Sequence, residues 1–365
     1  MDAGAWGEAG LYDPNAPGAP ERLELLRFLA GQGCTLEEMV AAHARGRLFA
    51  LAGDRLVRPD RDQFDLEQVA AMIDQPVEHV RAIWRAFGLV DVGDAVASPA
   101  DVEMLRIALS MTGVLGLDAT VGLARVMGSS LARIGDAIST SVRGRLPSMS
   151  VATSGSELAT ATSFAAITSI VPDLGRALDT LFRHHLESAR MHFERTESWD
   201  VVGDGGIRVA VGFADLCGFT GMTQQLRMDE LSLLLTRFEE IASDVVQDHA
   251  GRVVKFIGDA VMYVTTDAVS AVAVADDLIG AAQERGLQAR AGVTVGTALA
   301  LDGDYFGPVV NLAARLAALA EAGDILVSAE LVERLGDRRD ATSLGRRPIR
   351  GFPQPVPIAR LAPAR

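Results

Sequence analysis

Apolar residues change their spacing along the chain, and this change divides the sequence into two halves. Between residues 21 and 198 they recur at helical intervals, for instance at Leu105, Leu109 and Ile134. This spacing is typical of amphipathic helices, because it lines apolar side chains along one face. After Gly206 the apolar residues form short runs between helical segments, which is typical of buried strands.

The second half is expected to begin with strands and helices in the order βαββαβ, followed by one more helix and one more strand. The expected strands are 207–213, 252–257, 261–265, 289–301 and 324–328, and the expected helices are 229–250, 268–285 and 309–321. This order predicts an α+β fold with a ferredoxin-like sandwich as its core, preceded by an all-α domain.

The chain is therefore expected to have four parts. Residues 1–20 contain three prolines and four glycines without apolar periodicity, and they predict a disordered tail. An all-helical domain is expected at 21–198, in which Thr35 and Glu38 form a capping-box signal at a helix start. A glycine-rich hinge at 199–206 would lead into an α+β domain at 207–365.

Charge and cysteine content argue against several classes of protein. The net charge of −14 argues against a general binder of nucleic-acid backbones. Cys34 and Cys217 provide no disulfide framework, and no secretory signal or membrane-spanning run is expected. These features predict a cytoplasmic protein.

Three short segments of the second half carry polar residues suited to one active site. They read FADLCGFT at 213–220, KFIGD at 255–259 and DYFGPVVNLAAR at 304–315. Asp215 follows a strand and Asp259 lies in a hairpin, so both carboxylates could bind divalent cations. Taken singly, these aspartates could equally be a helix N-cap and a turn residue.

Together, in this order, the segments resemble the catalytic domain of class III nucleotidyl cyclases over residues 207–361. The resemblance implies that Asp215, Asp259 and the carbonyl of Leu216 bind two Mg²⁺ or Mn²⁺ ions. It also places Phe219 and Thr220 beside the substrate phosphates.

The resemblance assigns Lys255 and Asp304 to recognition of the base. Adenine presents an acceptor at N1 and a donor at N6, which match a lysine and a carboxylate, whereas guanine presents the reverse. A mismatch in a buried pocket costs about 1–3 kcal/mol, so the pair favours ATP. Each residue alone could be an ordinary solvated lysine or turn aspartate.

Asn311 and Arg315 are four residues apart and share a helix face. The resemblance implies that they orient the ribose and stabilise the transition state at phosphorus, although a polar surface stripe would look the same. Arg350 is a further candidate for the outer phosphates, with Arg346 and Arg347 as competitors for that role.

In the family, two chains share each site. The resemblance therefore implies a homodimer in which one chain supplies Asp215 and Asp259 and the other supplies the base- and ribose-binding residues. The reaction would convert ATP to 3′,5′-cyclic AMP and pyrophosphate. Two alternatives remain open: a silent nucleotide-binding sensor and a DNA-binding regulator.

The first half resembles the helical regulatory domain of some actinobacterial cyclases. Residues 64–89 also resemble a MerR-like helix-turn-helix, but its second helix carries only two arginines and a glutamate, so DNA binding is disfavoured. The helices at 100–180 could enclose an apolar small-molecule effector, although a packed core explains them as well.

Three histidines precede the hinge: His184, His185 and His192. A free histidine titrates near pH 6.5. The cluster therefore predicts regulation by pH, with solvated surface histidines as the alternative.

Overall fold

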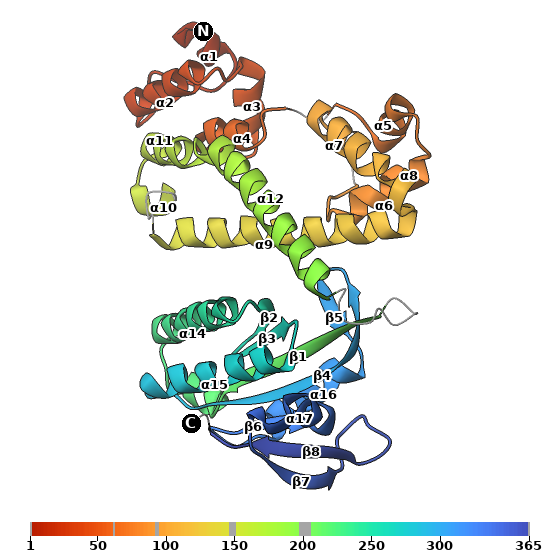
Figure 1. Cartoon of the computed structure of the whole chain (residues 1–365). Coiled ribbons are helices and arrows are strands. Elements are labelled where there is room, and N and C mark those ends of the chain that lie inside the picture. Colours follow the sequence, from red (N-terminus) through yellow and green to blue (C-terminus); the bar gives the residue numbers. More distant parts are fainter. Residues whose placement is uncertain (1, 61–62, 92–94, 146–150, 197–205, 364–365) are drawn as a thin grey trace. The chain divides into compact units, whose positions relative to one another are not determined.

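The computed structural model describes residues 2–60, 63–91, 95–145, 151–196 and 206–363. Contacts divide the chain into two units, Met1–Arg183 and His184–Arg365. The first unit is helical and the second is built mainly around a mixed sheet (Figure 1). This confirms the expected fold class.

The first unit contains helices joined by short connections. They are α1 (Ala3–Glu8), α2 (Ala19–Gly31), α3 (Leu36–Ala44), the 3-10 turn η1 (Leu48–Ala50), α4 (Leu51–Val57), α5 (Leu66–Ile73), α6 (Val77–Ala86), α7 (Pro99–Ser110), α8 (Thr112–Leu115), α9 (Leu117–Arg145), α10 (Val151–Ser154), α11 (Glu157–Thr168) and α12 (Val171–Thr196), which continues into the second unit. The capping box at the start of α3 is present: the Glu38 amide donates to Thr35 Oγ1 at 3.2 Å, and the Thr35 amide donates to Glu38 Oε2 at 2.7 Å.

The prediction of a disordered tail at residues 1–20 is wrong. This segment forms α1 and the start of α2, and Trp6 and Leu11 are 1% and 3% exposed. Both side chains join the core made by α2, α3 and α11. Two large apolar side chains therefore order a segment whose prolines and glycines suggested disorder, because burying them offsets the loss of chain entropy.

The segment resembling a helix-turn-helix forms α5 and α6. The buried face of α6 consists of Val80, Ile83 and Trp84, which pack in a core shared with α5, α7 and α9. The two arginines of α6 face carboxylates: Arg81 pairs with Glu67 and Asp91, and Arg85 with Asp91. These pairs compensate the positive charge that DNA binding would use.

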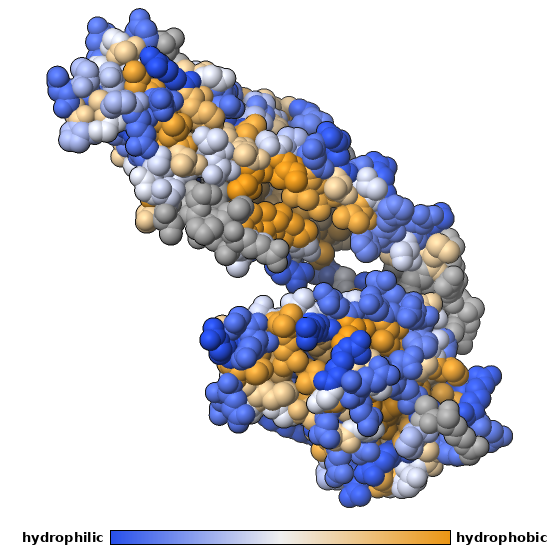
Figure 2. All heavy atoms as spheres, turned by 90° about the vertical axis from the view of Figure 1, so that its left-hand side faces the viewer, coloured by the Kyte–Doolittle hydropathy of each residue, from blue (hydrophilic) through white to orange (hydrophobic). Residues whose placement is uncertain are grey.

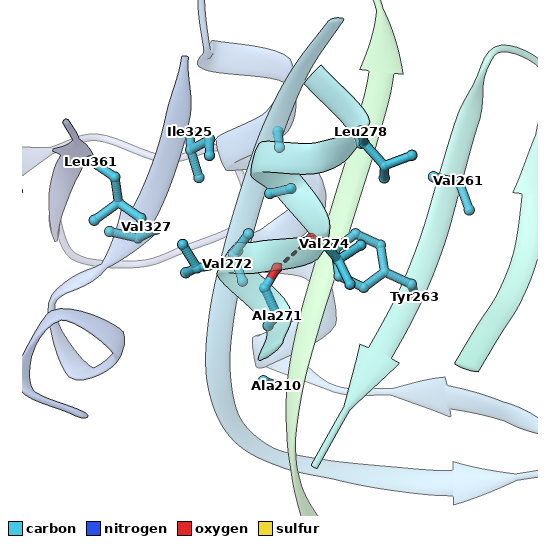
Figure 3. Close-up of a cluster of buried hydrophobic side chains, with 14 of the residues drawn as sticks. Ala210, Val261, Tyr263, Ala271, Val272, Val274, Leu278, Ile325, Val327 and Leu361 are labelled. Atoms are coloured by element: carbon cyan, nitrogen blue, oxygen red, sulfur yellow. Dashed lines mark hydrogen bonds between the residues drawn. The ribbon is translucent and has the colours of Figure 1, made fainter. Parts of the chain in front are cut away.

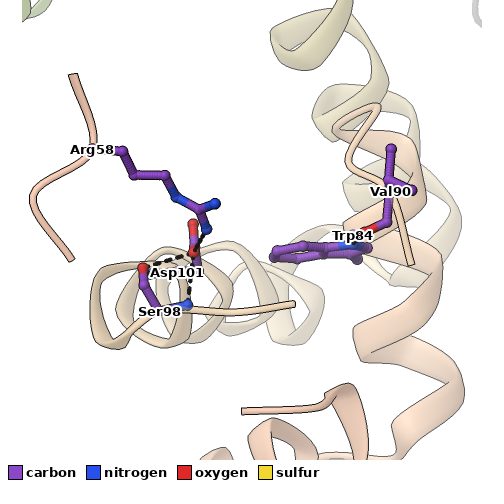
Figure 4. Close-up of polar contacts among 5 residues, drawn as sticks. All are labelled: Arg58, Trp84, Val90, Ser98 and Asp101. Carbon is purple, nitrogen blue, oxygen red and sulfur yellow. Dashed lines mark hydrogen bonds and ion pairs between the residues drawn. The ribbon is translucent and has the colours of Figure 1, made fainter. Parts of the chain in front are cut away.

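Polar contacts fix the ends of these helices (Figure 4). The Trp84 indole donates to the Val90 carbonyl at 3.0 Å. At the start of α7, Ser98 caps the helix and bonds Asp101, which also accepts from Arg58 at 2.7 Å. Burial opposes ionisation of Asp101, but these hydrogen bonds outweigh it and lower the pKa of the carboxyl.

One described stretch, Glu157–Met191, is long and apolar enough to cross a membrane by length and composition. The structure divides this stretch between α11 and α12 near Val171, and Arg176 and Asp173 form an exposed ion pair at the start of α12. Such a stretch is weak evidence for a membrane span. The expected hinge lies outside the described residues except for Gly206, which begins the first strand.

All the strands and helices expected in the second unit are present within a few residues of their expected bounds, and the structure adds further elements. They are β1 (Gly206–Leu216), α13 (Phe219–Thr223), α14 (Met228–Asp248), β2 (Arg252–Ile257), β3 (Ala260–Thr265), α15 (Ala268–Glu284), β4 (Ala289–Leu301), β5 (Asp304–Phe306), α16 (Pro308–Leu319), β6 (Ile325–Ser328), α17 (Ala329–Leu335), the 3-10 turn η3 (Gly336–Arg338), β7 (Ala341–Arg347) and β8 (Val356–Leu361). The sheet order is β2-β3-β1-β4-β6-β8-β7, with β5 paired to β4. The order β2-β3-β1-β4 is the antiparallel core expected of a ferredoxin-like fold.

Helices cover both faces of this sheet. On one face α15 packs over Tyr263 and Val261, and the Tyr263 hydroxyl donates to the Ala271 carbonyl at 2.8 Å (Figure 3). On the other face α16 packs on alternate residues of β1, namely Val209, Val211 and Phe213. Because successive strand residues point to opposite faces, β1 contributes to both cores, and its residues from Val209 to Ala214 are all buried.

The sheet and α16 approach each other closely at Gly292 of β4. A Cβ at this position would overlap backbone atoms of Ala313 and Ala317. The absence of a side chain at Gly292 therefore allows the short distance between α16 and the sheet. This helix carries two of the predicted site residues.

Candidate active site

The two predicted metal ligands lie at neighbouring strand ends. Asp215 is near the end of β1 and pairs in register with Ala260, while Asp259 occupies the tight turn between β2 and β3. The Leu216 amide donates to the Asp259 carbonyl at 3.2 Å. Burial, reinforced by the charge of Asp215, raises the pKa of the Asp259 carboxyl.

These residues fit hard divalent cations. Carboxylate and backbone carbonyl oxygens are suitable ligands for Mg²⁺ and Mn²⁺. Within the described part of the chain, no group of three or more histidine, cysteine, aspartate or glutamate side chains could complete a site. The remaining positions would therefore belong to water and to substrate phosphates, as Mg²⁺ prefers.

Arg290 is a site residue that the sequence reasoning missed. It is the second residue of β4 and lies opposite Asp215, and its guanidinium donates to both oxygens of that carboxylate, at 2.7 and 3.1 Å. It also donates to the carbonyls of Ala318 and Ala320 at the end of α16, at 3.1 and 3.0 Å. The sequence shows that Arg290 lies near the start of a long expected strand. Only the pairing register of β1 and β4 shows that it faces Asp215.

The turn after β1 carries the predicted phosphate-contacting residues. Gly218 has a φ of 74° and begins the short helix α13 at Phe219. Phe219 is half-buried against the core of the sheet. The side chain of Thr220 lies outside those that the structure describes.

Lys255 and Asp304 form an ion pair between Nζ and Oδ2. Their side chains are 40% and 25% exposed, so the pair is open to a ligand without being fully solvated. In the sheet order β3 and β1 separate β2 from β4, and Asp304 belongs to the hairpin that extends β4. The fold thus brings together two residues that are 49 positions apart.

Lys255 is also the single lysine of the chain. All the other residues among its 34 lysines and arginines are arginines. This count supports a specific use for an ammonium group at that position.

Asn311 and Arg315 are both exposed on the same side of α16, while Val310, Ala313 and Ala317 of this helix are buried. Neither side chain has a hydrogen bond or ion pair among the described residues. Both polar side chains are therefore available to a ligand.

Arg350 is exposed in the connection between β7 and β8. Its two competitors are engaged locally: Arg346 donates to the Pro355 carbonyl and Arg347 to the Leu344 carbonyl, each at 3.1 Å. This leaves Arg350 as the better candidate for an anionic group. Of the three histidines, His184 and His185 are exposed on α12, and the side chain of His192 lies outside the described side chains.

Comparison with known proteins agrees with this geometry. Residues 9–190 match the family described as adenylate cyclase regulatory domain, and residues 206–356 match the adenylate and guanylate cyclase catalytic domain. An uncharacterized protein of Mycobacterium tuberculosis strain H37Rv is 41% identical over 98% of this chain and 93% of its own length.

Two named relatives are similar over most of the chain. An adenylate cyclase of Streptomyces coelicolor is 32% identical over 75% of this chain and 72% of its own length. A protein of Mycobacterium tuberculosis strain CDC 1551 named pH-sensitive adenylate cyclase is 29% identical over 96% of this chain and 90% of its own length. On the two matched domains and these identities, the chain belongs to the adenylate cyclase family, as a member with an N-terminal regulatory domain.

Proposed function

We propose that this protein converts ATP to 3′,5′-cyclic AMP and pyrophosphate. The observation that carries the choice of nucleotide is the Lys255–Asp304 pair, which offers a donor and an acceptor side by side in a half-exposed position. Adenine matches this arrangement at N1 and N6. Guanine would present an acceptor to the carboxylate and a donor to the ammonium group.

Two divalent cations held by Asp215, Asp259 and the Leu216 carbonyl would supply the charge that acidifies the ribose 3′-hydroxyl and neutralises the triphosphate. Asn311 would hold the ribose in position. Arg315 would stabilise the charge that develops on the phosphoryl oxygens, since a guanidinium stays protonated and donates in a fixed plane. Arg350 would bind the leaving pyrophosphate.

A homodimer would complete each site. Within one chain Asp215 is held by Arg290 and Lys255 by Asp304, and no described hydrogen bond joins the two groups. Exposed apolar residues lie two positions from each member of the base-reading pair: Ile257 is 52% exposed and Phe306 is 46% exposed. Burying this apolar border against a second copy would exclude water from the bound base.

The proposal is tested by incubating the purified chain with ATP and Mn²⁺ and measuring cyclic AMP. A silent nucleotide-binding sensor would bind ATP and release no product. A DNA-binding regulator would shift a DNA duplex at physiological salt, although the acidic charge of the chain and the paired arginines of α6 disfavour it. The expected outcome is that the protein is recovered from the soluble, cytoplasmic fraction of cells and forms cyclic AMP.

Regulation by the helical unit is the second part of the proposal. The exposed His184 and His185 lie with His192 on α12, which leads toward the catalytic residues, and a relative of similar length is named for pH sensitivity. Protons can bias the enzyme only if two states of α12 bind them differently. An apolar small molecule bound by the helical unit is a separate candidate effector.

The histidine proposal is tested by comparing activity against pH for the full chain and for a variant in which all three histidines are glutamine. The variant should lose part of the pH dependence while keeping its maximal activity within about twofold. Superimposable normalised profiles would assign the cluster to solvated surface. The control is His249→Gln, because His249 lies outside the cluster and pairs with Asp277 at 2.7 Å.

A further inference from the structure

Asp304 lies on a small and weakly supported element. It begins β5, which has three residues and pairs only with β4, through Leu299–Phe306, Ala300–Tyr305 and Leu301–Asp304. The turn consists of Asp302 and Gly303, with φ values of 55° and 79°. A two-stranded hairpin is marginally stable by itself, so its position needs other contacts.

Arg252 supplies such contacts from β2, the strand that carries Lys255. Its guanidinium lies over the ring of Tyr305 at 5.2 Å from the ring centroid. It also donates a long hydrogen bond of 3.5 Å to the Gly303 carbonyl. Gly303 and Tyr305 are the two neighbours of Asp304, and Tyr305 is only 3% exposed, which makes it a firm anchor.

The pairing of β2 with β3 is irregular between Arg252 and Lys255. Arg252 and Val253 pair in register with β3, then the register shifts at Val254 before Lys255 pairs with Met262. This register shift is a β-bulge, and a bulge changes the direction in which the following side chains point. Arg252 and Lys255 thereby contact the same hairpin from either side of the bulge.

We propose that Arg252 is a positioning residue for base recognition, which holds the β4–β5 hairpin on β2 when the Lys255–Asp304 ion pair opens to admit a base. The inference rests on the proposed function. Lys255 and Asp304 must release each other at least in part to bind N1 and N6 of adenine. The Arg252 contacts involve the ring and the backbone beside Asp304, so they can persist in the bound state and keep the carboxylate at the correct distance.

Kinetics test this role with three variants. Arg252→Ala should raise the KM for ATP about fivefold and the relative use of GTP about threefold, with kcat within about twofold of the wild type, because loss of a cation–π contact and one hydrogen bond acts on binding. Arg252→Lys keeps a cation over the ring and should recover most of both effects. Arg285→Ala is the control, since Arg285 is also exposed in this unit, and among the described residues its side chain donates to the Ala281 carbonyl and pairs with Glu284 rather than with the hairpin.

A second readout is independent of turnover. Lys255 is the single lysine of the chain, so an amine-specific acylating reagent reports on it and the N-terminus alone. Mass spectrometry should show Lys255 acylated about threefold faster in Arg252→Ala than in the wild type and in Arg285→Ala, because Asp304 protects the amine less. Unchanged acylation together with unchanged KM and GTP use would overturn the role of Arg252.

The two proposals fail differently. A wild type that makes no cyclic AMP contradicts the proposed function, and the acylation rates still decide whether Arg252 positions Asp304. An active wild type whose Arg252→Ala variant loses only kcat contradicts the positioning role and leaves the proposed function intact.

Discussion

At the scale of single residues, the chemistry of this protein rests on charges held beside strand ends. Asp215 and Arg290 face each other across neighbouring strands, and Lys255 faces Asp304 across the sheet. Under the proposed function, both pairs satisfy groups that a nucleotide or a metal ion would engage. Ligand binding would then replace these partners within the chain by atoms of the ligand.

The base preference is expected to depend on two side chains. Changing Lys255→Glu together with Asp304→Cys removes both groups that match adenine, so kcat/KM for ATP should fall about 10- to 100-fold. Rates of cyclic AMP and cyclic GMP formation at equal nucleotide concentrations measure the effect. Equal use of ATP and GTP by the wild type would contradict the role of the pair.

Arg290 is expected to stabilise the fold and to compete with metal. Replacing it by glutamine removes two charge-assisted hydrogen bonds from the half-buried Asp215 and should cost about 1–3 kcal/mol of unfolding free energy. The freed carboxylate should bind Mn²⁺ more tightly in the absence of nucleotide. Urea unfolding and Mn²⁺ titration measure the two effects, and weaker Mn²⁺ binding would show that Arg290 does not compete.

At the scale of elements, the position of α16 depends on a glycine in the strand beneath it. Gly292→Ala should push α16 from the sheet, cost about 1–3 kcal/mol of unfolding free energy and lower activity, because Asn311 and Arg315 move with the helix. Urea unfolding and cyclic AMP assays measure both effects.

Gly280→Ala is the matched control for this prediction. Gly280 lies inside α15, and a Cβ there meets nothing within 4 Å. Alanine should stabilise this helix by up to about 1 kcal/mol. Equal stabilisation by both substitutions would show that the close approach at Gly292 carries no constraint.

At the scale of the whole molecule, activity is expected to need two chains. Asp215→Ala and Arg315→Ala should each be inactive, whereas their mixture should recover up to about a quarter of wild-type activity. Half of the randomly mixed dimers would be heterodimers, each with one intact site of two. Light scattering confirms dimers, and mixed dimers without activity would contradict a shared site.

The sequence alone determined the fold class of the catalytic unit and the helices and strands that form its core. The apolar run at 207–213 and the helical spacing at 229–250 are local patterns, and the structure places β1 and α14 within a few residues of them. Local patterns suffice there because each strand or helix must bury its own apolar face.

The same reasoning failed at residues 1–20, because burial of Trp6 and Leu11 depends on distant helices. It also did not identify β5, α17, β7 or β8, which are short or lie at the edge of the sheet. Their formation depends on neighbouring strands more than on their own periodicity.

The site shows the same division. The order and type of residues in three segments predicted a nucleotide and metal site, because chemistry fixes which side chains can serve it. Only the tertiary structure decided that Arg290 holds Asp215 and that Arg252 lies over Tyr305 beside Asp304. Strand register and the path of the β4–β5 hairpin set these contacts, and register depends on the packing of the whole sheet and not on any one segment.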